Sequence, residues 1–149
     1  MVRLTKRGFT IVELLIVIVV IGILATLVIS TFTGIQQKAR DTKRKAHISA
    51  IGGQIEAYNA QNGNYPTLAN MNTSAWLSAN MKGLDQTSLI DPRSASQTMA
   101  DNPAPDVYAY HVRAADGTTA CDNVTTQCAK YTLTATLEAG GTYQKSGSD

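Results

Sequence analysis

The stretch that decides the fold is KRGFTIVELLIVIVVIGILATLVIST, at residues 6–31. Within it, residues 9–31 contain one charged residue, Glu13, and no proline. At about 1.5 Å of rise per residue, a helix over residues 9–31 spans roughly 35 Å, which is enough to cross a hydrocarbon core of about 30 Å. We therefore predict that this stretch is a membrane-spanning helix.

The few charges at the start of this helix are informative. Arg3, Lys6 and Arg7 precede the apolar run, and Glu13 lies close to its first turn. A carboxylate at the centre of a bilayer costs about 2.5–3.5 kcal/mol on insertion scales, so Glu13 either reaches the headgroups or has a partner. The apolar run is longer than the core of a typical secretory signal, which disfavours a conventional cleaved signal peptide.

Gly8, Phe9 and Glu13 carry a family resemblance. The sequence KRGFTIVE at residues 6–13, followed by the apolar run, closely resembles the class III signal of type IV prepilins and of type II secretion pseudopilins. The resemblance implies that a prepilin peptidase cuts between Gly8 and Phe9 and that Phe9 is N-methylated. It also implies that Glu13 pairs with the Phe9 amine of a neighbouring subunit. Where major pilins commonly carry a proline, this chain has Ser30, and the absence of the proline suggests a more continuous helix, as in many pseudopilins.

The physical chemistry of charge burial supports the implied pairing. Cleavage would leave an ammonium group on Phe9, and pairing it with Glu13 removes the penalty of burying two separate charges among apolar helices. Such a pair also fixes the axial register between subunits, as a buried polar residue does in a coiled coil. Five basic residues lie within residues 38–45, so the positive-inside rule does not by itself settle the orientation of the helix.

Helical spacing continues beyond the apolar run. The residues that step by three or four are Phe32, Ile35, Ala39, Thr42 and Ala46, and then Ile48, Ile51, Ile55 and Tyr58 on a shifted face. We predict one helix from Phe9 to about Ala60, with Asn62-Gly63 as its C-terminal stop. The pair Gly52-Gly53 is either a continuous part of this helix or a kink, because glycine is a poor helix former.

Residues 63–149 predict a small α+β head. A short helix is expected at Thr73–Met81, and strands are expected at Val107–Ala114, Tyr131–Glu138 and Thr142–Lys145, followed by a loose tail at Ser146–Asp149. Alternation of apolar and polar residues in the second strand indicates one buried face. The predicted fold is therefore the pilin fold, in which a long N-terminal helix packs on a small C-terminal antiparallel sheet.

The two cysteines, Cys121 and Cys128, predict a disulfide if the head is exported. They lack a second cysteine pair and nearby histidines, which disfavours a structural zinc site. Closing so short a loop contributes about 2.5 kcal/mol in the loop-entropy model. The alternative is a pair of unlinked thiols in a loop.

Composition offers little support for a cofactor, for catalysis or for nucleic-acid binding. No cofactor is expected. The alternative is a bound calcium ion, held by carboxylates in or near loops: Asp85, Asp91, Asp101 and Asp106. His47 and His111 are far apart and have no nucleophile motif beside them, so no enzymatic activity is expected.

The formal net charge is +2, and about −1 without residues 1–8. The basic run at residues 38–45 lacks an aromatic platform for bases, which makes nucleic acid an unfavourable partner.

The resemblance implies a structural subunit rather than an enzyme. Its segments would be the leader (1–8), the membrane and filament-core half of the long helix (9–31), the amphipathic half (32–62) and the head (63–149). The expected assembly is a type IV pilus-like filament for motility, adhesion or DNA uptake; the alternative is a pseudopilin of a type II secretion or competence system. A membrane-tethered binding module that does not polymerise is the rival from another class.

The same resemblance implies a set of partners and a location. The partners are other copies of this chain, a prepilin peptidase, an assembly platform protein and a cytoplasmic ATPase. The precursor would lie in the cytoplasmic membrane with its head exported. The assembled form would then be an extracellular pilus or a pseudopilus in the periplasm and cell envelope.

Overall fold

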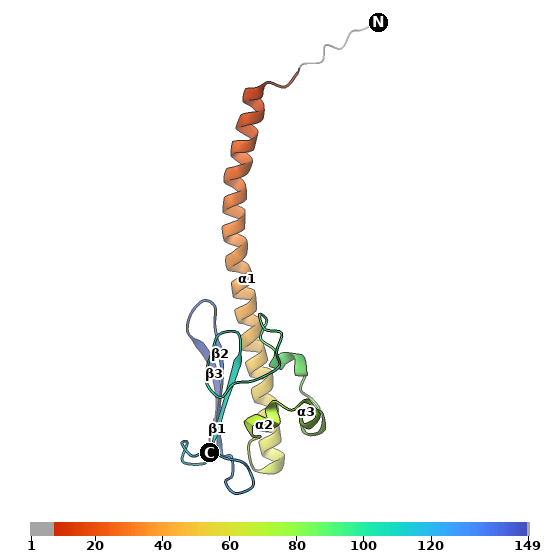
Figure 1. The fold of residues 1–149 in the computed structure, drawn as a ribbon, viewed down its shortest axis with the longest axis vertical. Helices are drawn as coiled ribbons and strands as arrows, with labels where there is room; N and C mark the ends of the chain where they lie inside the picture. Colours follow the sequence, from red (N-terminus) through yellow and green to blue (C-terminus); the bar gives the residue numbers. More distant parts are fainter. Residues whose placement is uncertain (1–7, 149) are drawn as a thin grey trace. The chain divides into compact units, whose positions relative to one another are not determined.

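The computed structural model describes residues 8–148 of the chain. The chain divides into two units, Met1–Gln37 and Lys38–Asp149, and the helix α1 (Ile11–Asn62) contributes to both (Figure 1). Of the leader expected at residues 1–8, the structure describes Gly8. The basic residues of the leader, Arg3, Lys6 and Arg7, lie outside the described residues. The second unit holds all the other helices and strands of the described chain.

Helix α1 confirms the predicted long helix. It begins at Ile11, two residues after the expected start, and runs through Gly52-Gly53 without a break in helical assignment. It ends at Asn62, and the next residue, Gly63, has a φ of +72° and donates its N–H to the Asn59 carbonyl at 2.7 Å. A glycine in the left-handed conformation is the common way to end a helix, so the predicted stop is also confirmed.

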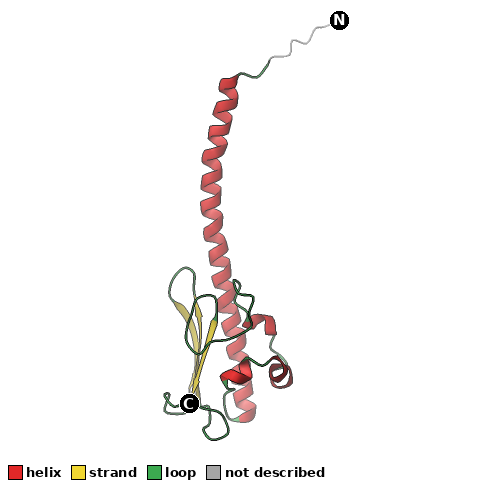
Figure 2. Cartoon of the chain, viewed as in Figure 1, coloured by secondary structure: helices red, strands yellow, loops and turns green. Residues whose placement is uncertain are grey.

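The head combines short helices with one antiparallel sheet (Figure 2). Its elements are α2 (Leu68–Met71), α3 (Ser74–Asn80), the 3-10 helix η1 (Gln86–Leu89) and the strands β1 (Tyr108–Arg113), β2 (Lys130–Thr136) and β3 (Thr142–Ser148). The sheet order is β1-β2-β3, and both neighbouring pairs are antiparallel. In the register, Leu133 lies opposite Tyr110 of β1 and Lys145 of β3.

The core of the head lies between the C-terminal part of α1 and the sheet. Helix α1 contributes Ile48, Ile51 and Ile55, each with no exposed area. The sheet contributes Tyr108, Tyr110, Val112, Tyr131, Leu133 and Ala135, and the connecting segment adds Met71, Leu77, Leu89 and Met99. A long helix packed on a small antiparallel sheet is the α+β architecture that the sequence predicted.

The residues that show helical spacing in α1 are buried only in part. Ile48, Ile51 and Ile55 are buried, but Ala39, Thr42 and Ala46 are exposed. Asp41 and Arg44 are buried instead, with 5% and 0% of their areas exposed. A pattern based on apolar spacing missed this because the buried charges are neutralised by residues distant in sequence, which no local pattern reveals.

The sequence predicts a loose tail at Ser146–Asp149, and this prediction is wrong for residues 146–148, which belong to strand β3. Strand β3 continues through Gly147, which lies opposite Tyr131, to Ser148, which lies opposite Lys130. Gly147 is buried, and a Cβ built on it would lie 2.5 Å from both Glu56 Oε1 and the Tyr131 ring and would also meet the Tyr65 hydroxyl. The absence of a side chain therefore lets β3 pass close to these residues.

Two glycine-to-alanine changes are expected to shift stability in opposite directions. Gly147→Ala forces a methyl group into the contacts just described, and overpacking of this kind lowers the free energy of unfolding by about 1–3 kcal/mol. Gly53→Ala is the matched control: it lies on the exposed face of α1 with nothing within 4 Å of a new Cβ. It should raise the free energy of unfolding by about 0.5–1 kcal/mol, because alanine is the better helix former.

Denaturant unfolding of the full chain in micelles measures both effects. The single tryptophan, Trp76, is half-buried against the core and reports on the head through its fluorescence. Equal stabilities for the two variants would contradict the close approach of β3 at Gly147.

Candidate functional site

The N-terminal end of α1 is closed by a capping box. Thr10 precedes the helix, and its hydroxyl accepts a hydrogen bond from the Glu13 N–H at 3.2 Å. In return, Glu13 Oε2 accepts from the Thr10 N–H at 2.9 Å and from its hydroxyl at 2.7 Å. Two backbone N–H groups that a helix start leaves unpaired are thereby satisfied. Such pairing matters most where no water is present to replace it.

Only one of the two carboxylate oxygens of Glu13 is used in this box. Among the described residues, Oε1 of Glu13 has no hydrogen-bond partner, while Oε2 takes both bonds from Thr10. The carboxylate lies at the positive end of the helix dipole, which favours a negative charge there. Glu13 is thus held in place at the helix end with an oxygen left to accept a bond from an external cation.

The N-terminal unit exposes an unusually continuous apolar surface. Its large apolar side chains from Phe9 to Ile35 have between 47% and 83% of their areas exposed. Soluble monomers rarely leave apolar surface of this extent uncovered. By length and composition, α1 is the one helix of the described residues that could cross a membrane.

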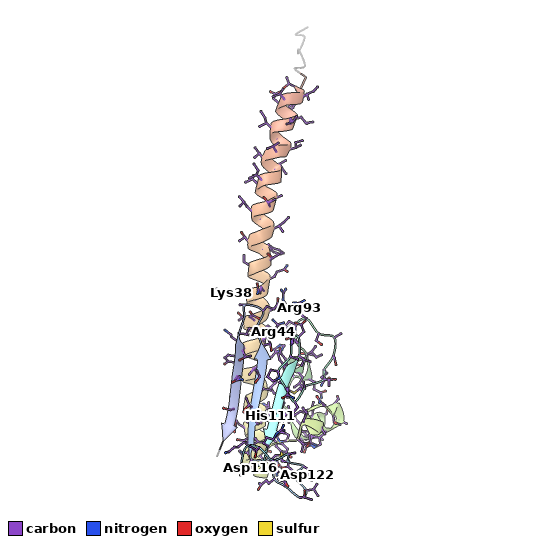
Figure 3. The ribbon with its side chains drawn as sticks, turned by 60° about the vertical axis from the view of Figure 1, so that its left-hand side comes forward. Lys38, Arg44, Arg93, His111, Asp116 and Asp122 are labelled. Carbon is purple, nitrogen blue, oxygen red and sulfur yellow. A yellow bond between two sulfur atoms is a disulfide. The ribbon has the colours of Figure 1, made fainter. Side chains whose placement is uncertain are left out.

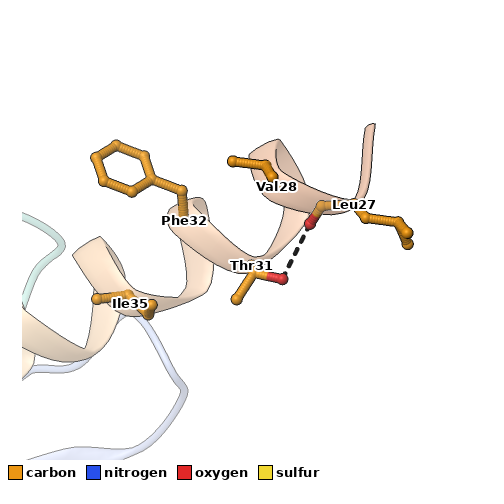
Figure 4. A pocket seen from close by; sticks show the side chains of 5 residues that line it. All are labelled: Leu27, Val28, Thr31, Phe32 and Ile35. Atoms are coloured by element: carbon orange, nitrogen blue, oxygen red, sulfur yellow. Dashed lines mark hydrogen bonds between the residues drawn. The ribbon is translucent and has the colours of Figure 1, made fainter. Parts of the chain in front are cut away.

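Two hydroxyl groups within this surface, those of Thr26 and Thr31, are satisfied inside the helix. The hydroxyl of Thr26 donates to the Ile23 carbonyl at 2.7 Å, and that of Thr31 donates to the Leu27 carbonyl at 2.9 Å. Figure 4 shows the second bond at the edge of a shallow apolar hollow between the side chains of one helix, lined also by Phe32 and Ile35. Hydroxyls bonded back to the helix are compatible with hydrocarbon or with neighbouring helices.

A comparison with known protein families finds a match in the N-terminal part of the chain. A family model described as a prokaryotic N-terminal methylation motif matches residues 3–29. Residues 3–29 therefore carry a prepilin-type segment. This confirms the resemblance to type IV pilins and pseudopilins over the N-terminal part of the chain.

The curated relatives of this chain are type II secretion proteins. The type II secretion system core proteins G of Dickeya chrysanthemi and of Escherichia coli are each 40% identical to it over 62 residues, which are 42% of this chain and 40% and 43% of theirs. That of Pseudomonas aeruginosa is 36% identical over 67 residues, 45% of this chain and 47% of its own. The chain thus spans less than half the length of these relatives. No solved structure gives a significant match.

The prepilin-type segment brings together most of the residues that the sequence singled out. Gly8 and Phe9 are exposed and directly precede the capping box that holds Glu13. Sequence reasoning missed Thr10, although Thr10-Ile11-Val12-Glu13 matches the capping-box signature of Ser or Thr followed three residues later by Glu. Recognising it would have given Glu13, already placed near the first turn, a partner in Thr10 without a structure.

The cysteines lie apart from this segment, in the head. Cys121 and Cys128 form the predicted disulfide, with their Cα atoms 5.1 Å apart. The bond closes a short loop, residues 121–128, within the connection between β1 and β2. Cys128 is fully buried in the core, so the disulfide ties Cys121 to the core through Cys128.

The four aspartates considered for calcium do not converge. Asp85 caps η1, Asp101 pairs with Arg113 and His111, and Asp91 and Asp106 are both within reach of Arg44. Within residues 8–148, no group of three or more acidic, cysteine or histidine side chains is arranged to hold a metal ion.

Arg44 is the centre of a charged cluster that sequence reasoning did not find. Its guanidinium makes a bidentate pair with Asp91, at 2.7 and 2.9 Å, and its Nη1 contacts both Asp41 and Glu138 at 2.8 Å. Arg40 makes a second bidentate pair with Glu138, at 2.7 Å for both bonds. Figure 3 shows Arg44 among the elements that meet here. The cluster joins α1 to the loop after η1 and to the turn between β2 and β3.

The cluster sets the charge state of its acids. Hydrogen bonds from Arg40 and then Arg44 lower the pKa of Glu138 to about 2. Burial opposes the ionisation of Asp41, but the N–H groups of Glu138 and Ala139 and the guanidinium of Arg44 outweigh it and lower its pKa. Both carboxylates therefore stay ionised well below neutral pH.

The stability of the head is expected to fall in acid. Because the pKa of Glu138 is about 2 in the folded state and near 4.5 when unperturbed, the unfolded chain binds the proton first as the pH falls. The contribution of Glu138 to the free energy of unfolding should be level above about pH 5.5 and decline from about pH 4.5 towards pH 2. Unfolding titrations at stepped pH measure this.

Glu138→Gln is the control for this pH dependence. The variant should be less stable at neutral pH and should lose a smaller part of its stability in acid, since its side chain binds no proton. Other acids with lowered pKa values, such as Asp101, keep part of the slope. An unchanged slope in the variant would contradict the role of Glu138.

Proposed function

We propose that this chain is a structural subunit of a pseudopilus-like filament, processed after Gly8 and assembled through its N-terminal helix. The observation that carries the proposal is Glu13, held at the start of an exposed apolar helix with Oε1 left without a partner among the described residues. Cleavage after Gly8 creates an ammonium on Phe9 that needs such an acceptor once it is buried.

The assembly follows from the same chemistry. The precursor is stored in the membrane through residues 9–31, and a prepilin peptidase removes the leader and methylates Phe9. A platform protein and a cytoplasmic ATPase then move subunits into a helical filament. Apolar packing of the exposed helices supplies most of the binding, and the pair between Glu13 and the neighbouring Phe9 fixes the register.

A pseudopilin is favoured here over the type IV pilus subunit expected first. The relatives with 36–40% identity over the N-terminal part are core proteins of type II secretion systems. The chain also has Ser30 where major pilins commonly carry a proline. The head contributes structure and surface, and we assign it no catalytic role.

Crosslinking and shearing of cells that express the chain test this proposal. A pseudopilus predicts a ladder of crosslinked oligomers that stays with the cell envelope and is absent from sheared surface material. A surface pilus predicts the ladder in the sheared fraction and would contradict the pseudopilin assignment. A monomer in every fraction, under conditions that support assembly, would contradict the filament itself and favour a tethered module.

A further inference from the structure

Five basic residues follow the apolar part of α1, and the fold of the head accounts for two of them. Arg40 and Arg44 belong to the charged cluster, where their guanidinium groups neutralise its carboxylates. The remaining three residues are all lysines on α1. They form what we call the lysine patch: Lys38, Lys43 and Lys45.

The fold of the head does not use the charges of the lysine patch. All three lysines are exposed, and no ion pair joins their ammonium groups to a carboxylate of residues 8–148. The Lys45 ammonium lies 5.9 Å from the centroid of the Tyr143 ring, which is a weak contact at an exposed position. Water alone satisfies an exposed lysine, so the reason to expect a partner comes from where the patch lies.

The lysine patch begins where the apolar surface of α1 ends. Ile35 is the last large apolar side chain of that surface and is 60% exposed, and Lys38 follows it within one turn. At about 1.5 Å of rise per residue, Lys45 is only about 15 Å beyond Ile35 along the helix. Side chains of a helix tilt towards its N-terminus, so these lysines lean towards the bilayer that the apolar part would cross. Their long stems allow the ammonium groups to reach the headgroups.

The charges of the head are also distributed unevenly between its two ends. Figure 3 shows Lys38 and Arg93 at the same end of the head, and Asp116 and Asp122 at the opposite end. Both aspartates are exposed and accept hydrogen bonds from threonine hydroxyls and N–H groups of their own loops. The end of the head that begins with Lys38 therefore presents cations, and the far end presents acids. This polarity is complementary to an anionic surface on the side of the apolar helix.

We propose that the lysine patch binds the headgroups of anionic phospholipids in the membrane that stores the precursor. The inference rests on the proposed storage of the precursor in a membrane. A lysine close to an anionic bilayer strengthens the attraction about fivefold, and the effect decays over a Debye length of about 8 Å at physiological salt. Lys38 is nearest to the apolar part of α1 and contributes most. Assembly breaks these contacts when the subunit leaves the bilayer.

Spin-labelled lipids test the proposal on the full chain reconstituted in phosphatidylcholine vesicles. The measured quantity is the association of spin-labelled phosphatidylglycerol with the chain relative to that of spin-labelled phosphatidylcholine. The unmodified chain should prefer phosphatidylglycerol about fivefold or more, and the preference should fall in 1 M salt, where the Debye length is about 3 Å. The triple variant Lys38→Gln, Lys43→Gln, Lys45→Gln should lower the preference about three- to fivefold. The basic leader is the same in both chains, so their difference measures the patch.

Lys38→Gln and Lys82→Gln are a matched pair. Both lysines are exposed, but Lys82 lies beside Gln54 and Gln61 of α1, about 24 Å or more beyond Lys38 along the helix. Lys38→Gln should lower the preference for phosphatidylglycerol about twofold or more, and Lys82→Gln should leave it unchanged.

Two results would overturn the proposal while the chain still enters the vesicles. One is equal association of the two lipids with the unmodified chain. The other is an unchanged preference in the triple variant, and reduced crosslinking between copies of that variant would then identify the patch as a subunit contact. A chain that fails to enter the vesicles would contradict the proposed membrane storage itself, and the inference with it.

Discussion

Replacing Glu13 by alanine is expected to abolish filament assembly while the precursor still accumulates in the membrane. Without Glu13, each Phe9 ammonium would be buried among apolar helices with no counterion, which costs about 3–5 kcal/mol. That penalty weakens the addition of each subunit by roughly 150- to 4,000-fold. Insertion should not suffer, because the change removes a carboxylate from an otherwise apolar helix. Quantifying crosslinked oligomers against total membrane-bound chain measures the effect.

Thr10→Ala separates capping from pairing. It removes the hydroxyl that bonds Glu13 but keeps the carboxylate. Loss of a helix cap costs about 0.5–2 kcal/mol, so assembly should be reduced far less than in Glu13→Ala. If Glu13→Ala assembled as well as the unmodified chain, the pairing role would be wrong. If the two variants were equally defective, Glu13 would act through the capping box instead.

Replacing Arg44 by alanine is expected to be the most damaging single change in the head. Arg44 is fully buried and contacts Asp41, Asp91 and Glu138 at 2.7–2.9 Å. Its removal leaves the buried Asp91 and Asp41 carboxylates short of a counterion, which destabilises the fold by about 3–5 kcal/mol. For a head of this size, such a loss lowers the unfolding temperature by about 15 °C or more. Thermal unfolding of the full chain in micelles measures the change.

Arg93→Ala is the matched control for Arg44. Its side chain is 52% exposed and lies 3.7 Å from Asp106 and 3.8 Å from Glu138. Exposed pairs with such long separations contribute at most about 1 kcal/mol. A loss of stability in Arg44→Ala as small as that in Arg93→Ala would show that the buried cluster does not hold the head together.

The features that sequence could predict are those with a local signal. The structure confirms three predictions that depend on neighbouring residues: a helix over the apolar run, helical continuation through Ile48, Ile51 and Ile55, and a helix stop at the glycine after Asn62. The cysteine pair also required only the presence of two cysteines in a head expected to be exported.

The features that sequence could not predict depend on residues far apart in the chain. The basic run at residues 38–45 gave no sign that Arg44 is buried, because the acidic partners of Arg44 extend from Asp41 to Glu138. The last residues of β3 have weak strand propensity, and their order comes from pairing with β2 and from the fit of Gly147 against the tyrosines. The capping box is the exception, since its signal at Thr10 was local and was overlooked.

The central claim is that the chain is cut after Gly8 and that the mature helix assembles from Phe9. N-terminal mass spectrometry of the crosslinked envelope fraction tests it most directly. The account predicts that the oligomers yield a peptide that begins at N-methylated Phe9. Oligomers or monomers that retain an intact Gly8–Phe9 bond in every fraction would contradict it.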